Sequence, residues 1–119
     1  NNYIFLSLLL RVDEGRPHEL ARALHTEHPE NPLVASTYAL SLYLQGRVNE
    51  AVGLMTALKP EDFDRPEISL YYGMFLTAAG QTDRAKGFLK RAENWPMLPE
   101  EKALLERIKQ EASNAEKPR

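Results

Sequence analysis

Two stretches of sequence that stand 34 residues apart decide the fold: Gln45-Gly46-Arg47-Val48-Asn49-Glu50-Ala51 and Ala79-Gly80-Gln81-Thr82-Asp83-Arg84-Ala85. In each, a segment with helical apolar spacing ends at a glycine, and a second such segment starts directly after a short polar turn. Glycine readily adopts the left-handed backbone that ends many helices. Both stretches therefore predict a tight turn between two helices, and their separation predicts a repeated helical hairpin.

Proline and glycine divide the rest of the chain into segments of similar length, each with apolar residues at helical spacing. Several segments open with proline, which suits the first turn of a helix because its missing N–H is not needed there. No segment alternates with a period of two for long enough to predict a strand. The sequence therefore predicts an all-α protein with about seven helices, over residues 2–13, 17–28, 32–45, 48–58, 66–79, 82–94 and 99–112, before a polar tail over 113–119.

The same shift of 34 residues also pairs side chains outside the two turns. The paired residues are Tyr38, Ala39, Leu42, Ala51 and Met55 in one unit and Tyr72, Gly73, Leu76, Ala85 and Leu89 in the next. This pattern resembles the tetratricopeptide repeat (TPR) family over about residues 3–97, more weakly in the first unit. The resemblance implies one domain, residues 1–112, with units over about 2–30, 31–64 and 65–97. The units would be tandem antiparallel helix hairpins in a short right-handed solenoid, with a capping helix over 99–112.

Small residues recur where the helices of a hairpin must approach each other closely. Ala39 and Gly73 stand at equivalent positions on the predicted first helices, and Ala51 and Ala85 on the second helices. A glycine inside a helix costs roughly 1 kcal/mol relative to alanine. Close packing at Gly73 would offset that cost, so the sequence predicts that these four positions lie at helix–helix contacts.

In the TPR family the first helix of each unit lines a concave groove that holds a partner. The resemblance implies these candidate partner-binding residues: Phe5, Leu8, Leu33, Thr37, Leu40, Leu44, Tyr71 and Met74. Glu67 stands where a base would be needed to bind a carboxylate, so the groove favours an apolar peptide or an amphipathic helix. Replacing Leu40 or Tyr71 with Lys is then expected to weaken partner binding without unfolding the domain. The partner is another protein, or a segment of the parent chain.

The two terminal helices differ in how their apolar residues are distributed. The last predicted helix places Leu104, Leu105, Ile108 and Ala112 along one side, and its charged residues, Glu101 among them, are expected on the other sides. The first helix is apolar nearly all round from Tyr3 to Leu10. Such a helix is expected to be covered on more than one side, which predicts either a preceding segment or a homodimer formed through this helix.

Composition narrows the classes of function. The net charge of −2 and the sequence pI of about 5.9 argue against nucleic-acid binding, which usually requires a basic face. The absence of cysteine excludes disulfides and thiolate sites but leaves the compartment open. The apolar run over 3–10 is too short to span a bilayer, which needs about 20 residues. Because the chain begins at Asn1, we expect a piece of a longer protein or a processed product.

No catalytic motif stands out in the sequence. There is no glycine-rich phosphate loop, nucleophile elbow or His-Glu-x-x-His motif. His25 and His28 could share one metal ion, but no third ligand is evident, so no metal site and no cofactor are expected. The sequence therefore predicts a protein-interaction module, with self-association through the first helix as the alternative and a metal-dependent or catalytic domain as a third class.

Overall fold

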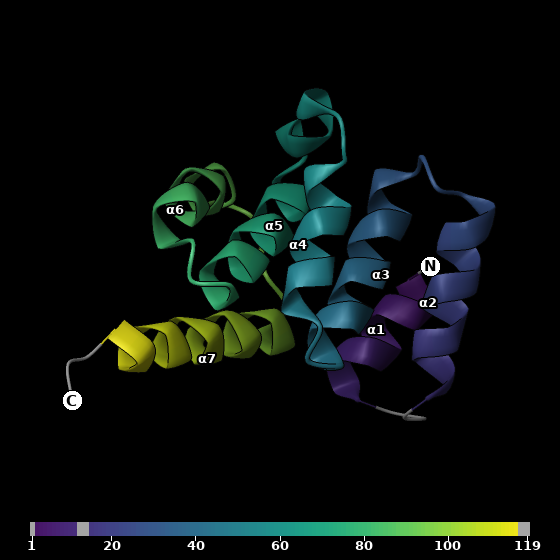
Figure 1. The fold of residues 1–119 in the computed structure, drawn as a ribbon, viewed down its shortest axis with the longest axis horizontal. Coiled ribbons are helices and arrows are strands. Elements are labelled where there is room, and N and C mark those ends of the chain that lie inside the picture. Colours follow the sequence, from purple (N-terminus) through teal and green to yellow (C-terminus); the bar gives the residue numbers. More distant parts are fainter. Residues whose placement is uncertain (1, 12–14, 117–119) are drawn as a thin grey trace.

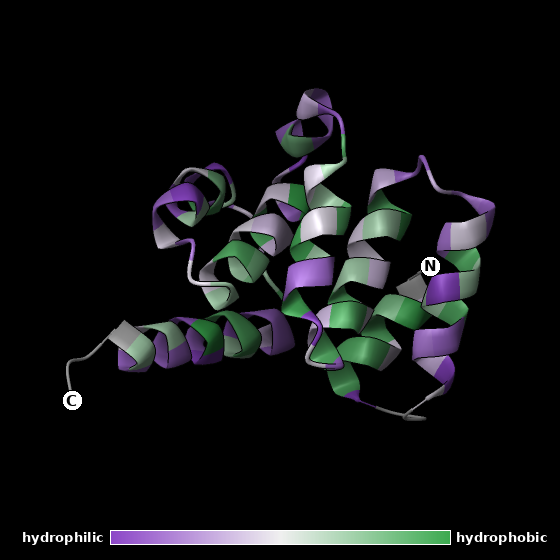
Figure 2. Ribbon diagram, viewed as in Figure 1, coloured by the Kyte–Doolittle hydropathy of each residue, from purple (hydrophilic) through white to green (hydrophobic). Residues whose placement is uncertain are grey.

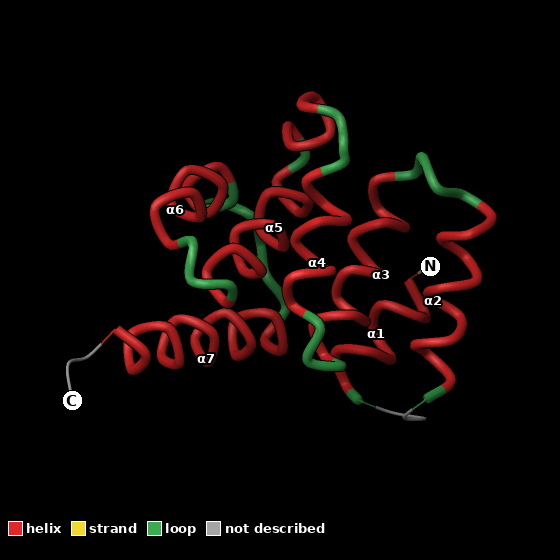
Figure 3. Tube along the Cα trace, in the orientation of Figure 1, coloured by secondary structure: helices red, strands yellow, loops and turns green. Residues whose placement is uncertain are grey.

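The computed structural model describes residues 2–11 and 15–116. The described residues form seven α-helices and one 3₁₀ helix, and they contain no strand (Figure 3). The predicted all-α class is therefore confirmed. The elements are α1 (Asn2–Leu10), α2 (Arg16–Glu27), α3 (Pro32–Leu44), α4 (Val48–Thr56), the 3₁₀ helix η1 (Pro60–Asp64), α5 (Pro66–Ala78), α6 (Thr82–Arg91) and α7 (Pro99–Glu116).

Several predicted helix ends change: α4 ends at Thr56 rather than at residue 58, α6 ends at Arg91 rather than at residue 94, and the ends of α1 and α7 also differ. The helix α1 ends at Leu10, and Arg11 follows with a left-handed backbone (φ 55°), so the prediction that the helix continues to residue 13 falls partly outside the described residues. The helix α7 continues to Glu116, four residues beyond the predicted end at 112. Alanine at 112 and 115 and Glu116 permit the helix to extend, which makes the start of the predicted polar tail helical.

The turns at the two decisive stretches have the same geometry. Gly46 and Gly80 have positive φ values of 79° and 84°. In each turn the next N–H reaches back to a helix carbonyl, from Arg47 to Leu42 at 2.9 Å and from Gln81 to Leu76 at 2.8 Å. These bonds satisfy carbonyl groups that a helix end otherwise leaves unpaired. The prediction of two equivalent glycine-terminated turns is confirmed.

Side chains also fix the starts of the middle helices. The Asn31 side-chain oxygen accepts hydrogen bonds from the N–H groups of Leu33 (3.0 Å) and Val34 (3.2 Å), which caps α3. Arg65 precedes α5 without a side-chain cap. Instead, Ser69 donates a hydrogen bond of 2.6 Å to the carbonyl oxygen of Phe63, which ties η1 to the start of α5.

Adjacent helices pack on one another along the chain, and α3 and α5 form the centre of the core (Figure 1). The four small residues lie inside these contacts, because Ala39, Ala51 and Ala85 are buried and Gly73 is buried on α5. A Cβ atom built on Gly73 would stand 2.7 Å from the Leu89 side chain of α6. A side chain at this position would therefore force Leu89 or the packing of α6 on α5 to shift.

The last helix does not continue the stack beyond α6. Figure 1 shows α7 running crosswise below α5 and α6, and its main contacts are with α5 and α1. Leu104, Leu105 and Ile108 are buried in these contacts, as their spacing predicts. α7 therefore covers the last predicted unit through its first helix, α5, and also reaches α1.

The distribution of hydropathy separates the inner and outer helices. Figure 2 shows that α1 is apolar around much of its surface, whereas α2, α6 and α7 carry hydrophilic outer faces. None of the helices in the described residues combines the length and the apolar character needed to cross a membrane.

Candidate binding groove

The structure divides the eight predicted groove residues into three groups. Phe5, Leu33, Thr37 and Tyr71 together line one pocket of about 300 Å³. Leu44 lines a second pocket, on the C-terminal side of the same helices. The remaining three, Leu8, Leu40 and Met74, line neither pocket and are at most 2% exposed.

The first pocket, named here the aromatic pocket, lies where α1, α3 and α5 meet the connection that leads into α7. Its further lining residues are Ser36, Glu67, Trp95, Pro96, Leu98 and Glu101. The residues from 95 to 101 were not predicted to belong to the groove. They reach it because the chain passes over α5 after α6, which brings the start of α7 against the first helices.

A buried hydrogen bond joins the pocket wall to α7. The Tyr71 hydroxyl donates to Glu101 Oε2 at 2.6 Å, and the Leu98 N–H donates to Glu101 Oε1 at 2.8 Å. Both Tyr71 (2% exposed) and Glu101 (4%) are buried. Burial, and next the hydrogen bond to Glu101, raise the pKa of Tyr71 above its ordinary value, so the hydroxyl keeps its proton and remains the donor.

The burial of Glu101 corrects the expectation that this carboxylate faces solvent. Glu101 precedes Leu104, Leu105 and Ile108 by three, four and seven residues, which places it on the apolar side of α7. The spacing alone therefore predicts a buried position for Glu101, whereas its charged side chain favours an exposed one. Among the described residues, no Lys, Arg or His nitrogen lies within 4.0 Å of the Glu101 carboxylate.

Aromatic rings form much of the pocket wall. The Phe5 and Tyr71 rings meet edge to face with their centroids 5.5 Å apart. Trp95, the only tryptophan in the sequence, is half-buried against the core. At the rim, Glu67 lies 3.5 Å from an Arg65 nitrogen, but Arg65 is not part of the lining. The charged groups that line the aromatic pocket are thus both carboxylates, Glu67 and Glu101.

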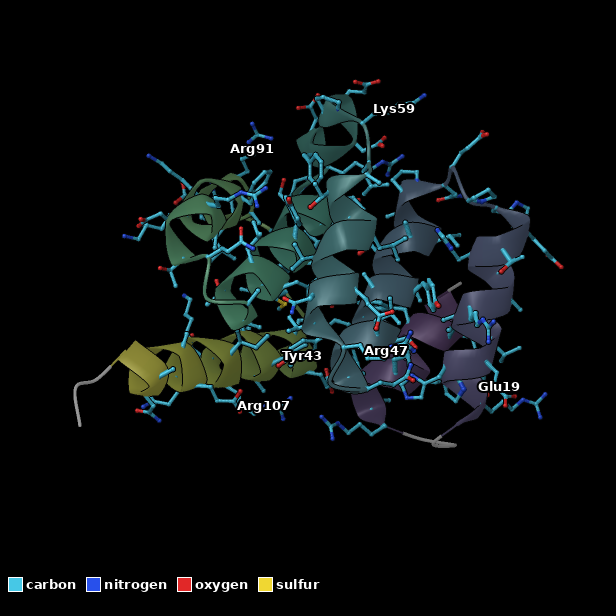
Figure 4. All side chains as sticks on the ribbon, viewed as in Figure 1. Glu19, Tyr43, Arg47, Lys59, Arg91 and Arg107 are labelled. Carbon is cyan, nitrogen blue, oxygen red and sulfur yellow. The ribbon has the colours of Figure 1, made fainter. Side chains whose placement is uncertain are left out.

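The second pocket, of about 610 Å³, lies along the C-terminal half of α7. Tyr43 of α3 and Arg107 of α7, both labelled in Figure 4, line it together with Arg11 and Glu111. Burial and the nearby Glu111 raise the pKa of the Tyr43 hydroxyl, while the cationic Arg107 and Arg11 oppose that shift. Charges of both signs therefore surround this pocket, and no single ligand charge is favoured.

The buried positions correct the expected effect of two substitutions. Leu40 is 0% exposed and Tyr71 is 2% exposed, so a lysine at either position would be placed in the core. Loss of binding at these positions could not be separated from loss of folding. Leu33, which is only half-buried and lines the aromatic pocket, is the suitable probe of the groove instead.

The three histidines have separate surroundings. His18 Nδ1 lies 2.7 Å from the Ser41 hydroxyl oxygen, and burial lowers the pKa of His18. The His25 ring packs against the Tyr38 ring with centroids 5.2 Å apart. His28 is exposed. Within the described residues, no group of three or more His, Cys, Asp or Glu side chains is arranged to hold a metal ion.

The predicted groove residues thus line separate pockets along α7 rather than one continuous channel. The aromatic pocket brings together four predicted residues from three helices. It is concave and largely apolar, and it contains a small number of polar groups, which is typical of ligand-binding sites in proteins. No protein-family model, curated protein or solved structure matches this chain.

Proposed function

We propose that this chain is a protein-interaction module of the TPR-like helical-repeat type, which binds a peptide segment of another protein in the aromatic pocket. The observation that carries the proposal is the pocket itself, in which Phe5, Leu33, Thr37 and Tyr71 converge from three helices. The 34-residue period, the paired glycine turns and the small residues at helix contacts support the repeat assignment.

The chemistry of the lining favours binding over catalysis. Aromatic and aliphatic side chains provide large contact areas, and such residues dominate the energy of protein interfaces. The pocket volume of about 300 Å³ suits one or two side chains of a peptide rather than a whole helix. Because α7 covers the neighbouring surface of α5 and α1, a bound segment would lie beside α7.

Peptide selection tests this proposal. A random peptide library panned against the intact protein is expected to yield binders with micromolar Kd. Leu33→Glu places a charge at the wall of the aromatic pocket, and we expect it to weaken these binders at least about tenfold. The matched control is Leu54→Glu on α4, which makes the same change at a half-buried position outside the pocket and is expected to leave Kd within about twofold.

Circular dichroism first shows whether both variants are folded, so that a loss of binding can be separated from a loss of folding. If the two folded variants bind the selected peptides equally well, the aromatic pocket is not the binding site. A library that yields no binder at all would remove peptide recognition as the function.

Self-association is the second candidate function, and the exposed side of α1 favours it. Tyr3, Leu6 and Leu10 are 64%, 43% and 53% exposed. By the repeat alignment, Leu6 corresponds to Tyr38 and Tyr72. Both tyrosines are covered by the element that precedes their helix. The His25 ring of α2 packs on Tyr38, and the Phe63 ring of η1 packs on Tyr72 with the two ring centroids 5.0 Å apart. Nothing in the described residues covers the equivalent stripe on α1.

A dimer formed through α1 is expected to respond to one substitution on this stripe. Leu6→Glu should convert a dimer to a monomer in light scattering coupled to size exclusion, because it places two charges in an apolar interface. Phe5 is the wrong position for this test, since it packs on Tyr71 in the aromatic pocket. Leu54→Glu, which makes the same change on α4 at a half-buried position outside the aromatic pocket, serves as the control. A wild-type protein that is monomeric at all concentrations would contradict self-association.

A further inference from the structure

The aromatic pocket contains a buried carboxylate that forms no ion pair with any residue that the structure describes. Glu101 is 4% exposed and accepts hydrogen bonds from Tyr71 and the Leu98 N–H, one at each oxygen. Both oxygens of the Glu101 side chain therefore act as acceptors within the protein. No cationic side chain of the described residues lies within 4.0 Å of it. Burying a charge without an ion-pair partner is costly. The N-terminus of α7 offsets part of this cost, because Glu101 lies in its first turn, and a cationic ligand would offset more.

The rest of the lining has the chemistry that recognises an organic cation. Phe5, Tyr71 and Trp95 contribute aromatic rings, and cations are attracted to aromatic faces. Glu67 adds a second carboxylate at the rim, where Arg65 approaches from outside the lining. Within residues 2–11 and 15–116, no basic residue lines this pocket.

From this arrangement we propose that the aromatic pocket binds the lysine side chain of the partner peptide, with Glu101 as the buried counter-charge. The proposal rests on the proposed peptide-binding function and names the residue type that the pocket selects. The butyl stem of lysine would pack on the rings, and its ammonium would donate to Glu101 and Glu67. Each carboxylate oxygen has room for about two hydrogen bonds, so Glu101 can still accept from a ligand. The Thr37 hydroxyl, which donates to the Leu33 carbonyl, can accept as well.

The volume of the pocket agrees with a single lysine side chain. At about 300 Å³ it lies at the lower end of the range for small-ligand sites. A compact ammonium with three donors can satisfy acceptors on several sides of such a pocket. The acidic lining also repels an anionic group. This agrees with the presence of Glu67 where a basic residue would be needed to bind a carboxylate.

The test uses n-butylammonium as a lysine side-chain mimic and 1-butanol as its neutral counterpart. Trp95 emission reports directly on the pocket, because the chain has no other tryptophan. At constant ionic strength, butylammonium is expected to produce a saturable change with a millimolar Kd, as suits a ligand of about five heavy atoms. Butanol is expected to produce no saturable change over the same concentrations.

Charge-neutralising variants identify the group responsible. Glu101→Gln is expected to weaken butylammonium binding at least about fivefold. The control is Glu106→Gln, an equal charge change at an exposed position of the same helix outside the pocket, expected to leave Kd within about twofold. If Glu101→Gln does not fold, Glu67→Gln at the rim replaces it, with an expected weakening of about two- to fivefold.

Three results would overturn the lysine pocket: no saturable change with butylammonium, equal responses to butylammonium and butanol, or equal Kd values for Glu101→Gln and Glu106→Gln. Its failure can be distinguished from failure of the peptide-binding function. Selected peptides that lose affinity with Leu33→Glu but contain no lysine would leave the interaction module intact and remove only the lysine assignment. Butylammonium binding without any peptide binder would leave the cation-binding pocket intact and remove the peptide-binding function.

Discussion

Replacing Leu40 with Lys is expected to leave the protein unfolded at room temperature. Leu40 lies in the middle of α3 and is 0% exposed. Removing a buried leucine side chain costs about 2–5 kcal/mol, and an unpaired ammonium in its place adds the cost of desolvating a charge. Domains of this size are stable by only about 5–15 kcal/mol in total. The loss of helical circular dichroism at room temperature measures this effect.

The control for this prediction is Leu44→Lys on the same helix. Leu44 is half-buried near the end of α3, so the lysine stem can extend along the apolar surface and place its charge in solvent. Leu44→Lys is therefore expected to remain folded with a modest loss of stability. If both variants melt at the same temperature, the assignment of Leu40 to the core is wrong.

Gly73→Ala is expected to destabilise the protein, although alanine is the better helix former. An alanine Cβ at this position would stand 2.7 Å from Leu89 Cγ and Cδ2 and 3.2 Å from the Leu89 backbone nitrogen. The side chain can move, but the backbone nitrogen limits how far α5 and α6 can adjust. Overpacking of this kind typically costs about 1–3 kcal/mol, more than the roughly 1 kcal/mol gained in helix propensity. The free energy of unfolding from urea titration measures the balance.

Gly87→Ala on α6 measures the gain in helix propensity without the cost of overpacking. Nothing lies within 4 Å of a Cβ built at Gly87, so only the gain in helix propensity remains, and we expect stabilisation by about 0.5–1 kcal/mol. Combining Gly73→Ala with Leu89→Ala should cost less than the sum of the single changes, because Leu89 is the clashing group. Equal stabilisation by Gly73→Ala and Gly87→Ala would show that the helices do not approach closely at Gly73.

Much of the fold could be predicted because its signals are local. Gly46 and Gly80 mark helix ends through backbone conformation, and Pro32 and Pro66 mark helix starts through the missing N–H. Such signals act within a few residues, so a single sequence is enough to detect them. The sequence does not predict the 3₁₀ helix η1, because a single short turn has too few residues to show a period.

The position of α7 could not be predicted in the same way. Its apolar side was visible in the spacing of Leu104, Leu105 and Ile108, but an apolar side does not specify which helices it will contact. The connection from α6 carries the chain back over α5, and only the folded structure shows this path. The roles of Trp95, Leu98 and Glu101 in the groove depend on that path, so they were missed as well.

The candidate groove was only partly predictable because core and binding surfaces use the same residue types. The resemblance placed Leu8, Leu40 and Met74 in the groove together with Phe5 and Leu33. All five are large and apolar, and helical spacing alone cannot separate a residue between packed helices from one that lines an open pocket. Only the folded structure distinguishes the two groups, because it shows which parts of α3 and α5 are covered by α1 and α7.

Peptide titration with two simultaneous readings tests binding in the aromatic pocket most directly. A selected peptide carrying a dye is titrated with the protein, and dye anisotropy reports binding while Trp95 emission reports occupation of the pocket. We predict that both signals follow the same Kd and that Leu33→Glu weakens both together. A peptide that binds by anisotropy while Trp95 emission stays constant would contradict the proposed site, because the partner would then lie elsewhere on the protein.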